Sequence, residues 1–401
     1  MGGAVGGREK PALLGGFPLG PLTGIRVVEI AGIGPCPWCA MVLSDMGAEV
    51  IRVDRADAVG SRAADDRSLE FVNLRGRRSL AVDLKQPDGV EVVLRLASRA
   101  DALIEGFRPG VVERLGIGPG PCLERNGKLV YGRMTGWGQN GPRSQAPGHD
   151  INYLAQTGLL DAIGPPGGGP VPPLNLIADY GGGGMALAFG VVCGILEARG
   201  SGEGQVIDAA MVDGAGLLGS LFFGMRQIGR WRNRRGTNMI DGGAPYYGTY
   251  ETADGRWIAV GAIEPKFYGV LVEAIGLSID ELPDMDEVGE WPQVRRRFAE
   301  VFKSRTRDEW TEVLLPLEAC YSPVLSLDEA LEDEQNLARE AFVSEDGVLQ
   351  PAPAPRFSRT PGEISGPAAS PGEHTDEVLR DWGFEAGELQ SLRAGGAIVQ
   401  R

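Results

Sequence analysis

Residues 25–54 read IRVVEIAGIGPCPWCAMVLSDMGAEVIRVD. The β-branched run at 25–30 predicts a strand, the apolar residues at 38–46 recur at helical spacing, and 49–54 predicts a second strand. A Gly/Pro turn separates the first two segments, and Gly47 ends the helix. A strand, a helix and a strand within about thirty residues form a βαβ unit, whose two strands run parallel with a right-handed crossover.

The same alternation continues along the chain. It predicts strands at 79–83, 102–105, 129–135 and 205–208, and helices at 88–98, 182–199 and 211–225. The fold class is therefore α/β, with an open large domain built on a parallel sheet. In such a sheet, ligands bind at the carboxyl ends of the strands.

The pattern changes after residue 225. A β-hairpin is predicted at 246–251 and 256–261, followed by helices at 265–275, 291–304 and 308–315. These elements indicate a smaller α+β domain over residues 235–330. Beyond it, a proline-rich strap at 350–366 leads to two short helices at 376–382 and 386–394.

Composition excludes several classes of protein. The 401 residues include 39 Lys and Arg against 54 Asp and Glu, and the net charge of −15 argues against binding to nucleic acid or to an anionic membrane. The apolar stretches at 185–198 and 217–225 are too short or too interrupted to span a bilayer. Residues 1–20 predict a flexible leader with no signal-peptide pattern, and five sparse cysteines fit a reducing compartment. We expect a cytoplasmic protein.

The turn after the first predicted strand, GIGPCPWC at 32–39, lies where a dinucleotide fold places its phosphate loop. The third glycine of GxGxxG is absent, and two prolines remove backbone donors, which disfavours a nicotinamide or flavin site. Asp54 lies at the right distance for a ribose hydroxyl, but Arg55 beside it suggests a phosphate. Cys36 and Cys39 form a CxxC at a helix start, a redox pattern, although packing cysteines are the simpler interpretation.

Two motifs carry candidate catalytic groups. His149, one of two histidines, follows a glycine-rich loop that leaves a predicted strand. Asp179 precedes four glycines that open an apolar helix, where free N–H groups and missing side chains would let a ligand approach. A helix cap with glycines for packing is the alternative. A set of basic residues could neutralise a polyphosphate such as that of coenzyme A: Arg52, Arg55, Arg75, Arg77, Arg78, Lys85, Arg108 and Arg114.

With these motifs in place, the sequence resembles the α-methylacyl-CoA racemases of the family III CoA-transferase superfamily over roughly residues 21–385. The stretches that carry the resemblance are PLTGIRVVEIAGIGPCPWCAMVLSDMGAEVIRVDR, EGFRPGVVERLG, TGWGQNGPRSQAPGHDINY, PPLNLIADYGGGGM, GQVIDAAMVDG, NMIDGGAPYYGTYETADGRWIAVGAIEPKFY and PAPRFSRTPG.

The resemblance implies an interlocked homodimer in which residues 335–401 complete the Rossmann-like large domain of residues 21–225. It implies a catalytic set of His149, Asp179 and Glu264, with Glu264 as the partner of His149. The positions that it implies for coenzyme A and substrate are Ile33, Arg55, Val82, Asp83, Leu84, Lys85, Gly106, Phe107, Arg108, Arg114, Gly148, Asp150, Ile151, Asn152 and Tyr153.

These residues suggest racemisation of a 2-methylacyl-CoA by proton transfer through an enolate. His149, balanced by Glu264, would serve one face of C2 and Asp179 the other, with backbone N–H groups near the glycines stabilising the enolate. No metal or redox cofactor is expected, because coenzyme A is part of the substrate. The alternatives are a CoA-transferase with an aspartyl intermediate at Asp179, and a non-catalytic acyl-CoA-binding protein. The acyl chain is not specified.

Overall fold

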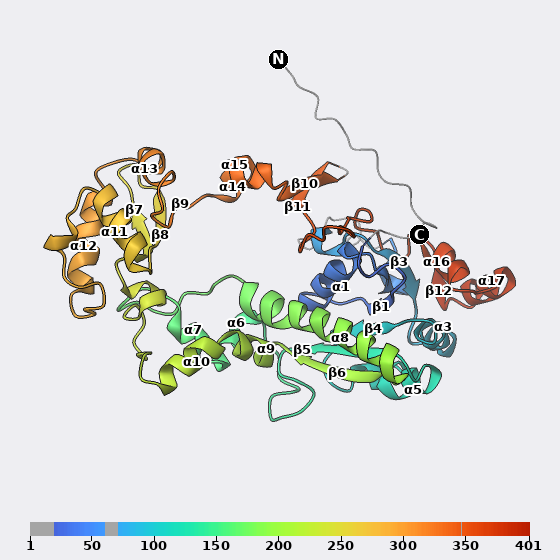
Figure 1. Cartoon of the computed structure of the whole chain (residues 1–401). Helices are drawn as coiled ribbons and strands as arrows, with labels where there is room; N and C mark the ends of the chain where they lie inside the picture. Colours follow the sequence, from blue (N-terminus) through green and yellow to red (C-terminus); the bar gives the residue numbers. More distant parts are fainter. Residues whose placement is uncertain (1–19, 61–70, 346) are drawn as a thin grey trace, which may run out of the picture. The chain divides into compact units, whose positions relative to one another are not determined.

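The computed structural model describes residues 20–60, 71–345 and 347–401 (Figure 1). The chain divides into two compact units. The first contains residues up to 153 together with 176–215 and 340–401, and the second contains 154–175 and 216–339. The second unit therefore includes residues 154–175, which the sequence pattern did not separate from the first. The expected leader lies outside the described residues, apart from Gly20.

The described part of the first unit is built on a seven-stranded sheet with the order β12-β3-β2-β1-β4-β5-β6. Strands β1 to β6 are parallel, and β12 is antiparallel to β3. The predicted α/β class with a parallel sheet is thus confirmed. The strands are β1 Arg26–Ile30, β2 Glu49–Arg55, β3 Arg78–Val82, β4 Ala102–Glu105, β5 Val130–Thr135, β6 Gln205–Ala210 and β12 Ile398–Val399.

Helices cover both faces of this sheet. Along the chain they are α1 Pro35–Asp45, α3 Pro87–Ala97, α4 Val111–Arg114, α5 Pro119–Arg125, α6 Asp150–Gln156, α8 Ala186–Ser201, α9 Met211–Leu218, α16 Thr375–Asp381 and α17 Ala386–Ala394. Two 3-10 turns, η1 Ala56–Ala58 and η2 Phe71–Leu74, a π-helix, η3 Leu176–Met185, and a hairpin of β10 Phe342–Glu345 and β11 Val348–Pro351 complete the unit.

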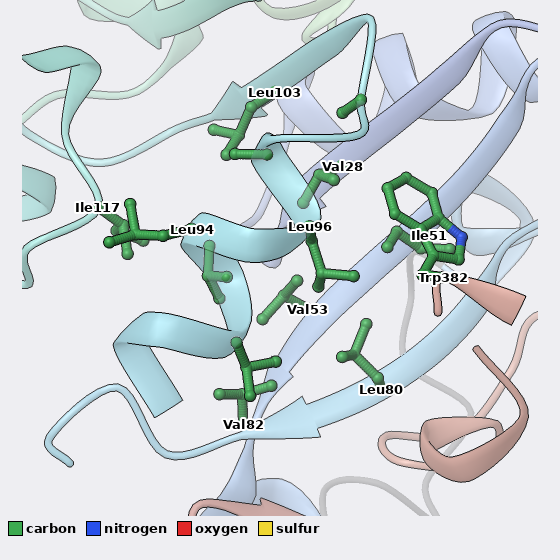
Figure 2. Close-up of a cluster of buried hydrophobic side chains, with 14 of the residues drawn as sticks. Val28, Ile51, Val53, Leu80, Val82, Leu94, Leu96, Leu103, Ile117 and Trp382 are labelled. Carbon is green, nitrogen blue, oxygen red and sulfur yellow. The ribbon is translucent and has the colours of Figure 1, made fainter. Parts of the chain in front are cut away.

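One apolar core lies between the sheet and the helices α3, α5, α16 and α17 (Figure 2). Because side chains alternate along a strand, Val28 and Ile30 enter this core while Glu29 between them faces the other side, where α1 contacts β1. Trp382, which follows α16, is fully buried in the same core, so the C-terminal segment is part of it.

Helix α1 begins three residues earlier than expected, at Pro35 instead of Trp38. The turn that we expected at 31–37 is shorter because a proline is tolerated in the first helical turn, where its missing N–H would have no partner. Gly34 precedes the helix with a φ of 71°, a conformation that favours glycine.

The apolar helical run at residues 176–201 is longer than expected, since η3 continues into α8. Its 26 residues, with a mean hydropathy of 1.5 in the most apolar window, are long and apolar enough to cross a bilayer, contrary to the expectation from residues 185–198 alone. Half of that window is buried, and α8 packs against β5 and β6, as a core helix of an α/β unit does.

The second unit contains a three-stranded antiparallel sheet of β7 Tyr247–Glu251, β8 Trp257–Gly261 and β9 Tyr321–Pro323. An aromatic core that includes Tyr250, Phe298, Phe302 and Trp310 packs on it. Its helices are α7 Leu159–Ala162, α10 Ser220–Gln227, α11 Pro265–Ala274, α12 Trp291–Phe302, α13 Arg307–Leu314, α14 Leu327–Glu332 and α15 Glu334–Ala338, with short turns η4 Met239–Gly243 and η5 Ile279–Glu281.

Candidate active site

The sheet order places several predicted ligand-binding segments at one edge. Strands β3, β2, β1 and β4 are neighbours and run parallel, so the residues after them lie at the same carboxyl edge. The predicted positions at this edge are Ile33 after β1, Arg55 at the end of β2, residues 82–85 at the end of β3, and residues 106–108 after β4. Val82 is buried in the core, so only its main chain is available to a ligand (Figure 2).

Asp179 lies in the first turn of the π-helix η3, which begins at Leu176, six residues before the helix start that we expected at residue 182. The N–H groups of Asp179 and Ala178 both donate to Oδ2 of Asp150, at 2.8 Å each. Asp150 is only 5% exposed and follows His149 in the chain. One buried carboxylate therefore joins the His149 segment to the Asp179 segment.

The His149 main chain begins helix α6. Its N–H donates to Oδ1 of Asn152 at 3.0 Å, and its carbonyl accepts from the Asn152 N–H at 2.8 Å. This reciprocal bonding across four residues is typical of a helix N-terminus. The His149 side chain is exposed in the chain, as a group that meets a substrate must be.

Tyr153 is buried beside the same groups, and its hydroxyl donates to the carbonyl of Gly148. Burial raises the pKa of Tyr153, the nearby Asp179 carboxylate raises it further, and the Arg108 guanidinium opposes both. Asp179, Tyr153 and Arg108 are therefore close enough to act on one another electrostatically.

The Asp179 carboxylate lies over the turn that begins α1. A Cβ placed on Gly34 would be 3.8 Å from Oδ2 of Asp179. The next residue, Tyr180, stacks on Trp38 of α1 with ring centroids 5.5 Å apart, and its hydroxyl accepts from the Asn73 side chain at 3.3 Å. Contacts from α1 and η2 thus hold the segment that carries Asp179.

The glycines after Tyr180 serve packing. A Cβ on Gly182 would be 2.4 Å from the Ala215 backbone nitrogen, and one on Gly184 would be 2.7 Å from the Trp38 ring. From the sequence we expected these glycines to let a ligand come close to the main chain. For Gly182–Gly184 the packing alternative is correct, because α1 and α9 occupy the space where side chains would be.

The basic residues separate into two groups. Arg52, Arg75 and Arg77 are each 3% exposed and pair with Asp54, Asp45 and Glu29 respectively, and Arg78 pairs with Glu49, Glu377 and Asp381. These four are structural, so the polyphosphate set that we expected was too large.

The second group of basic residues is exposed and consists of Arg55, Lys85, Arg108 and Arg114. Arg55 pairs with the exposed Asp57, and the hydrogen bond between them raises the pKa of Arg55. In the part of the chain that the structure describes, Lys85, Arg108 and Arg114 form no ion pair within 4.0 Å. All four exposed residues belong to the positions that the family resemblance implied.

Glu264 belongs to the second unit. It is exposed and precedes α11, where its carbonyl accepts from the N–H of Phe267 and of Tyr268. The structure therefore joins His149, Asp150, Tyr153 and Asp179 within one unit, while Glu264 stands on the other. The remaining positions, Ile151 and Asn152, are exposed on α6, and Phe107 is half-buried after β4.

The competing sequence motifs do not form sites of their own. Cys36 and Cys39 are buried, and burial and the Glu29 carboxylate raise the pKa of both thiols, which opposes a redox role. Asp54 accepts from Arg52 and Ser79, so it is not free for a ribose. Across residues 20–60, 71–345 and 347–401, no three His, Cys, Asp or Glu side chains form a group that could hold a metal ion.

Comparison with known proteins identifies the family of this chain. The model of CoA-transferase family III matches residues 22–375. The chain is 47% identical over 375 residues to the α-methylacyl-CoA racemase of Mus musculus, covering 93% of this chain and 96% of that protein. It is 45% identical over 380 residues to the α-methylacyl-CoA racemase of Homo sapiens, covering 94% and 97%.

A solved structure supports the fold. The crystal structure of a CAIB/BAIF family protein from Brucella suis has a TM-score of 0.79 and 23% identity to this chain, and covers 91% of this chain and all of its own. The match to the family model includes residues of both units. The chain therefore belongs to CoA-transferase family III.

Proposed function

We propose that this protein is an α-methylacyl-CoA racemase, an isomerase that interconverts (R)- and (S)-2-methylacyl-CoA thioesters. The observation that carries the proposal is the bonding of Asp150 to the main chain of Asp179, which joins the two candidate proton-transfer groups of the first unit. High identity to two racemases over nearly the whole chain supports it.

The α-proton of a thioester is weakly acidic, so its removal needs a positioned base and a stabilised enolate oxygen. His149 takes or returns the proton on one face of C2, and Asp179 does so on the other. The two exchange roles between the enantiomers. The N–H groups of Ala178 and Asp179 are bonded to Asp150, so other donors must stabilise the enolate oxygen.

The test is hydrogen exchange in D2O. Either enantiomer of a 2-methylacyl-CoA gains deuterium at C2, and His149→Ala and Asp179→Ala each remove most of this exchange. The second histidine offers a matched control, since His374 precedes α16 and contacts Ser79, so His374→Ala retains exchange. Retained exchange in both active-site variants contradicts the proposal.

The transferase alternative gives a different result in the same samples. A CoA-transferase forms a covalent acyl or CoA adduct on the aspartate, and a free carboxylic acid then gains coenzyme A from the donor thioester. Mass spectrometry of the Asp179 peptide during turnover, with an acid acceptor present, separates the two. The racemase shows deuterium in the substrate and no mass shift on Asp179.

Homodimer formation is part of the proposal. The outer face of α8 presents Phe189 and Leu196, which are 71% and 72% exposed in the single chain, and large exposed apolar side chains in a row mark an interaction surface. A second copy covers this face, as the interlocked dimer requires. Sedimentation gives a dimer for the native protein, and Phe189→Glu with Leu196→Glu shifts it toward the monomer.

The proposed chemistry uses side chains of this chain alone, with coenzyme A supplied as part of the substrate. We further propose a cytoplasmic location and no membrane or nucleic-acid partner. Dialysis against a chelator leaves the exchange rate unchanged on this proposal, and loss of exchange that Mg²⁺ or Zn²⁺ restores contradicts it.

A further inference from the structure

A buried ion-pair network lies beneath the loop that follows β4. Glu105, the last residue of β4, is fully buried, and its Oε1 accepts from Nε of Arg133 on β5 at 3.0 Å. The same guanidinium, 7% exposed, contacts both oxygens of Glu113 on α4, at 2.8 and 3.3 Å. The network therefore links two neighbouring strands to the short helix beyond the loop.

The loop itself is attached to this network. The other oxygen of Glu105 accepts from the N–H of Phe107 at 2.7 Å, so one side chain holds the loop at its start while Arg133 holds α4 through Glu113. Between these two points, the N–H of Val111 donates to the carbonyl of Arg108 at 3.1 Å and closes the turn.

Two cations lie on the held segment. Arg108 is in the loop, and Arg114 is in α4, with its guanidinium 3.3 Å from where a Cβ on Gly110 would be. Both are exposed and, among the described residues, form no ion pair, whereas Arg133 beneath them has two carboxylate partners. The carboxylates of this network are thus engaged by Arg133, and the two exposed cations remain available to an anion.

Burial raises the pKa of Glu105, and the bonds from Phe107 and Arg133 oppose that shift. A buried carboxylate without its cation is costly, so the pair is retained only where its geometry is satisfied. Here the bonds of Glu105 to Phe107 and of Arg133 to Glu113 attach the segment 106–114 to strands β4 and β5.

We propose that Glu105, Arg133 and Glu113 are positioning residues that hold Arg108 and Arg114 in place for the phosphate groups of a CoA thioester. The ligand assignment rests on the proposed function. Because the protein carries a net charge of −15, binding of a polyanion depends on cations held locally, and this network holds two of them.

Calorimetry with coenzyme A, together with exchange kinetics on 2-methylbutanoyl-CoA, tests the proposal in the full-length protein. Glu105→Gln keeps the size of the side chain and removes the charge that holds Arg133. We expect it to raise the Kd for coenzyme A and the KM about tenfold, with kcat within twofold. The Glu113 side chain is partly exposed, so Glu113→Gln is a second variant with little risk to folding. We expect it also to raise the Kd for coenzyme A and the KM.

Two comparisons separate positioning from a general structural role. Glu91→Gln breaks the exposed Arg125–Glu91 pair in the same unit and leaves the Kd unchanged. In a double-mutant cycle, adding Glu113→Gln to Arg114→Ala weakens binding less than Glu113→Gln does alone, because Glu113 acts through the arginine on the same helix.

An unchanged Kd in both Glu105→Gln and Glu113→Gln overturns the proposal, as does full additivity in the cycle. If the wild-type protein binds coenzyme A but exchanges no proton, the proposed racemase function fails while the binding comparison still decides this inference.

Discussion

Asp150 binds Asp179 through the main chain of Asp179 and not through its carboxylate. A single oxygen of Asp150 accepts two successive N–H groups, at residues 178 and 179, across 28 and 29 positions of sequence. The position of the Asp179 side chain therefore depends on a residue that shares a peptide bond with His149.

Asp150→Ala removes the carboxylate that accepts from the N–H groups of Ala178 and Asp179, so both groups lose this hydrogen bond. We expect a loss of about 1–3 kcal/mol in the free energy of unfolding and a fall in kcat of at least tenfold, since Asp179 is no longer held. Urea unfolding and deuterium exchange measure the two effects. Asp150→Asn keeps an amide oxygen at the same place and restores most of the stability. Wild-type kcat in Asp150→Ala would show that Asp179 is positioned by other contacts.

Gly184→Ala places a methyl group 2.7 Å from the Trp38 ring and 2.9 Å from the carbonyl oxygen of Pro35. Neither neighbour is the end of a flexible side chain, so we expect a destabilisation of about 1–3 kcal/mol from overpacking. Gly200→Ala is the matched control near the end of α8, because no atom lies within 4 Å of its added Cβ. That variant is expected to be stabilised by up to about 1 kcal/mol. Thermal unfolding of both gives shifts of opposite sign, and equal shifts contradict the packing explanation.

The thiols differ in reactivity. Cys36, Cys39 and Cys122 are buried, and burial raises the pKa of each, to about 12 for Cys122. Because the thiolate is the reactive form, we expect these three to resist a maleimide at pH 8 in the native protein. Cys320 is exposed, and we expect it to react. Cys193 on α8 is exposed in the single chain, so we expect it to react in the monomer and to be protected in the proposed dimer. Mass spectrometry of labelled peptides checks this, with guanidinium-unfolded protein as the control in which all five react.

The pair of Arg307 and Glu329 makes the second unit sensitive to acid. The hydrogen bond from Arg307, at 2.7 Å, and that from the Ser326 N–H lower the pKa of Glu329 to about 2 from an ordinary 4.5. A lowered pKa in the folded state gives stability that is complete above pH 4.5 and is lost as the pH falls toward 2.

We therefore expect Glu329→Gln to lower the Tm by a few degrees at pH 7 and to have no effect near pH 2. Thermal unfolding of wild-type and variant protein across that range measures the difference. Glu281→Gln breaks the exposed Arg297–Glu281 pair, so its effect should stay small at every pH. A difference between wild type and Glu329→Gln that does not vary with pH contradicts the assignment.

Local patterns predicted most of the sheet. Strand β1, helix α1 and strand β2 were recognised because their apolar periodicity and bounding glycines lie within thirty residues. Strands β12 and β9 were missed because they have two and three residues, and their partners are distant, as in the pairing of Ile398 with Val82. No periodicity develops over so few positions.

The site was predicted less completely, for a related reason. Arg77 and Arg108 have the same side chain in similar sequence surroundings, yet Arg77 is buried on Glu29 and Arg108 is exposed. Burial depends on which strands become neighbours, and that information is not local. The same holds for Asp150, which the resemblance placed among the substrate positions. Its bonds to the main chain at residues 178 and 179 are not indicated by its neighbours in the sequence.

The place of β12 at the sheet edge has a consequence for biosynthesis. The first unit needs Trp382 in its core and Ile398 of β12 paired with β3. Residues 216–339 of the second unit are synthesised before either of these residues. Domains fold as units during synthesis, at about 5–20 residues per second. The main segment of the second unit is continuous, whereas the first unit is complete only once Ile398 has been made. We therefore expect the first unit to reach its native state after the second.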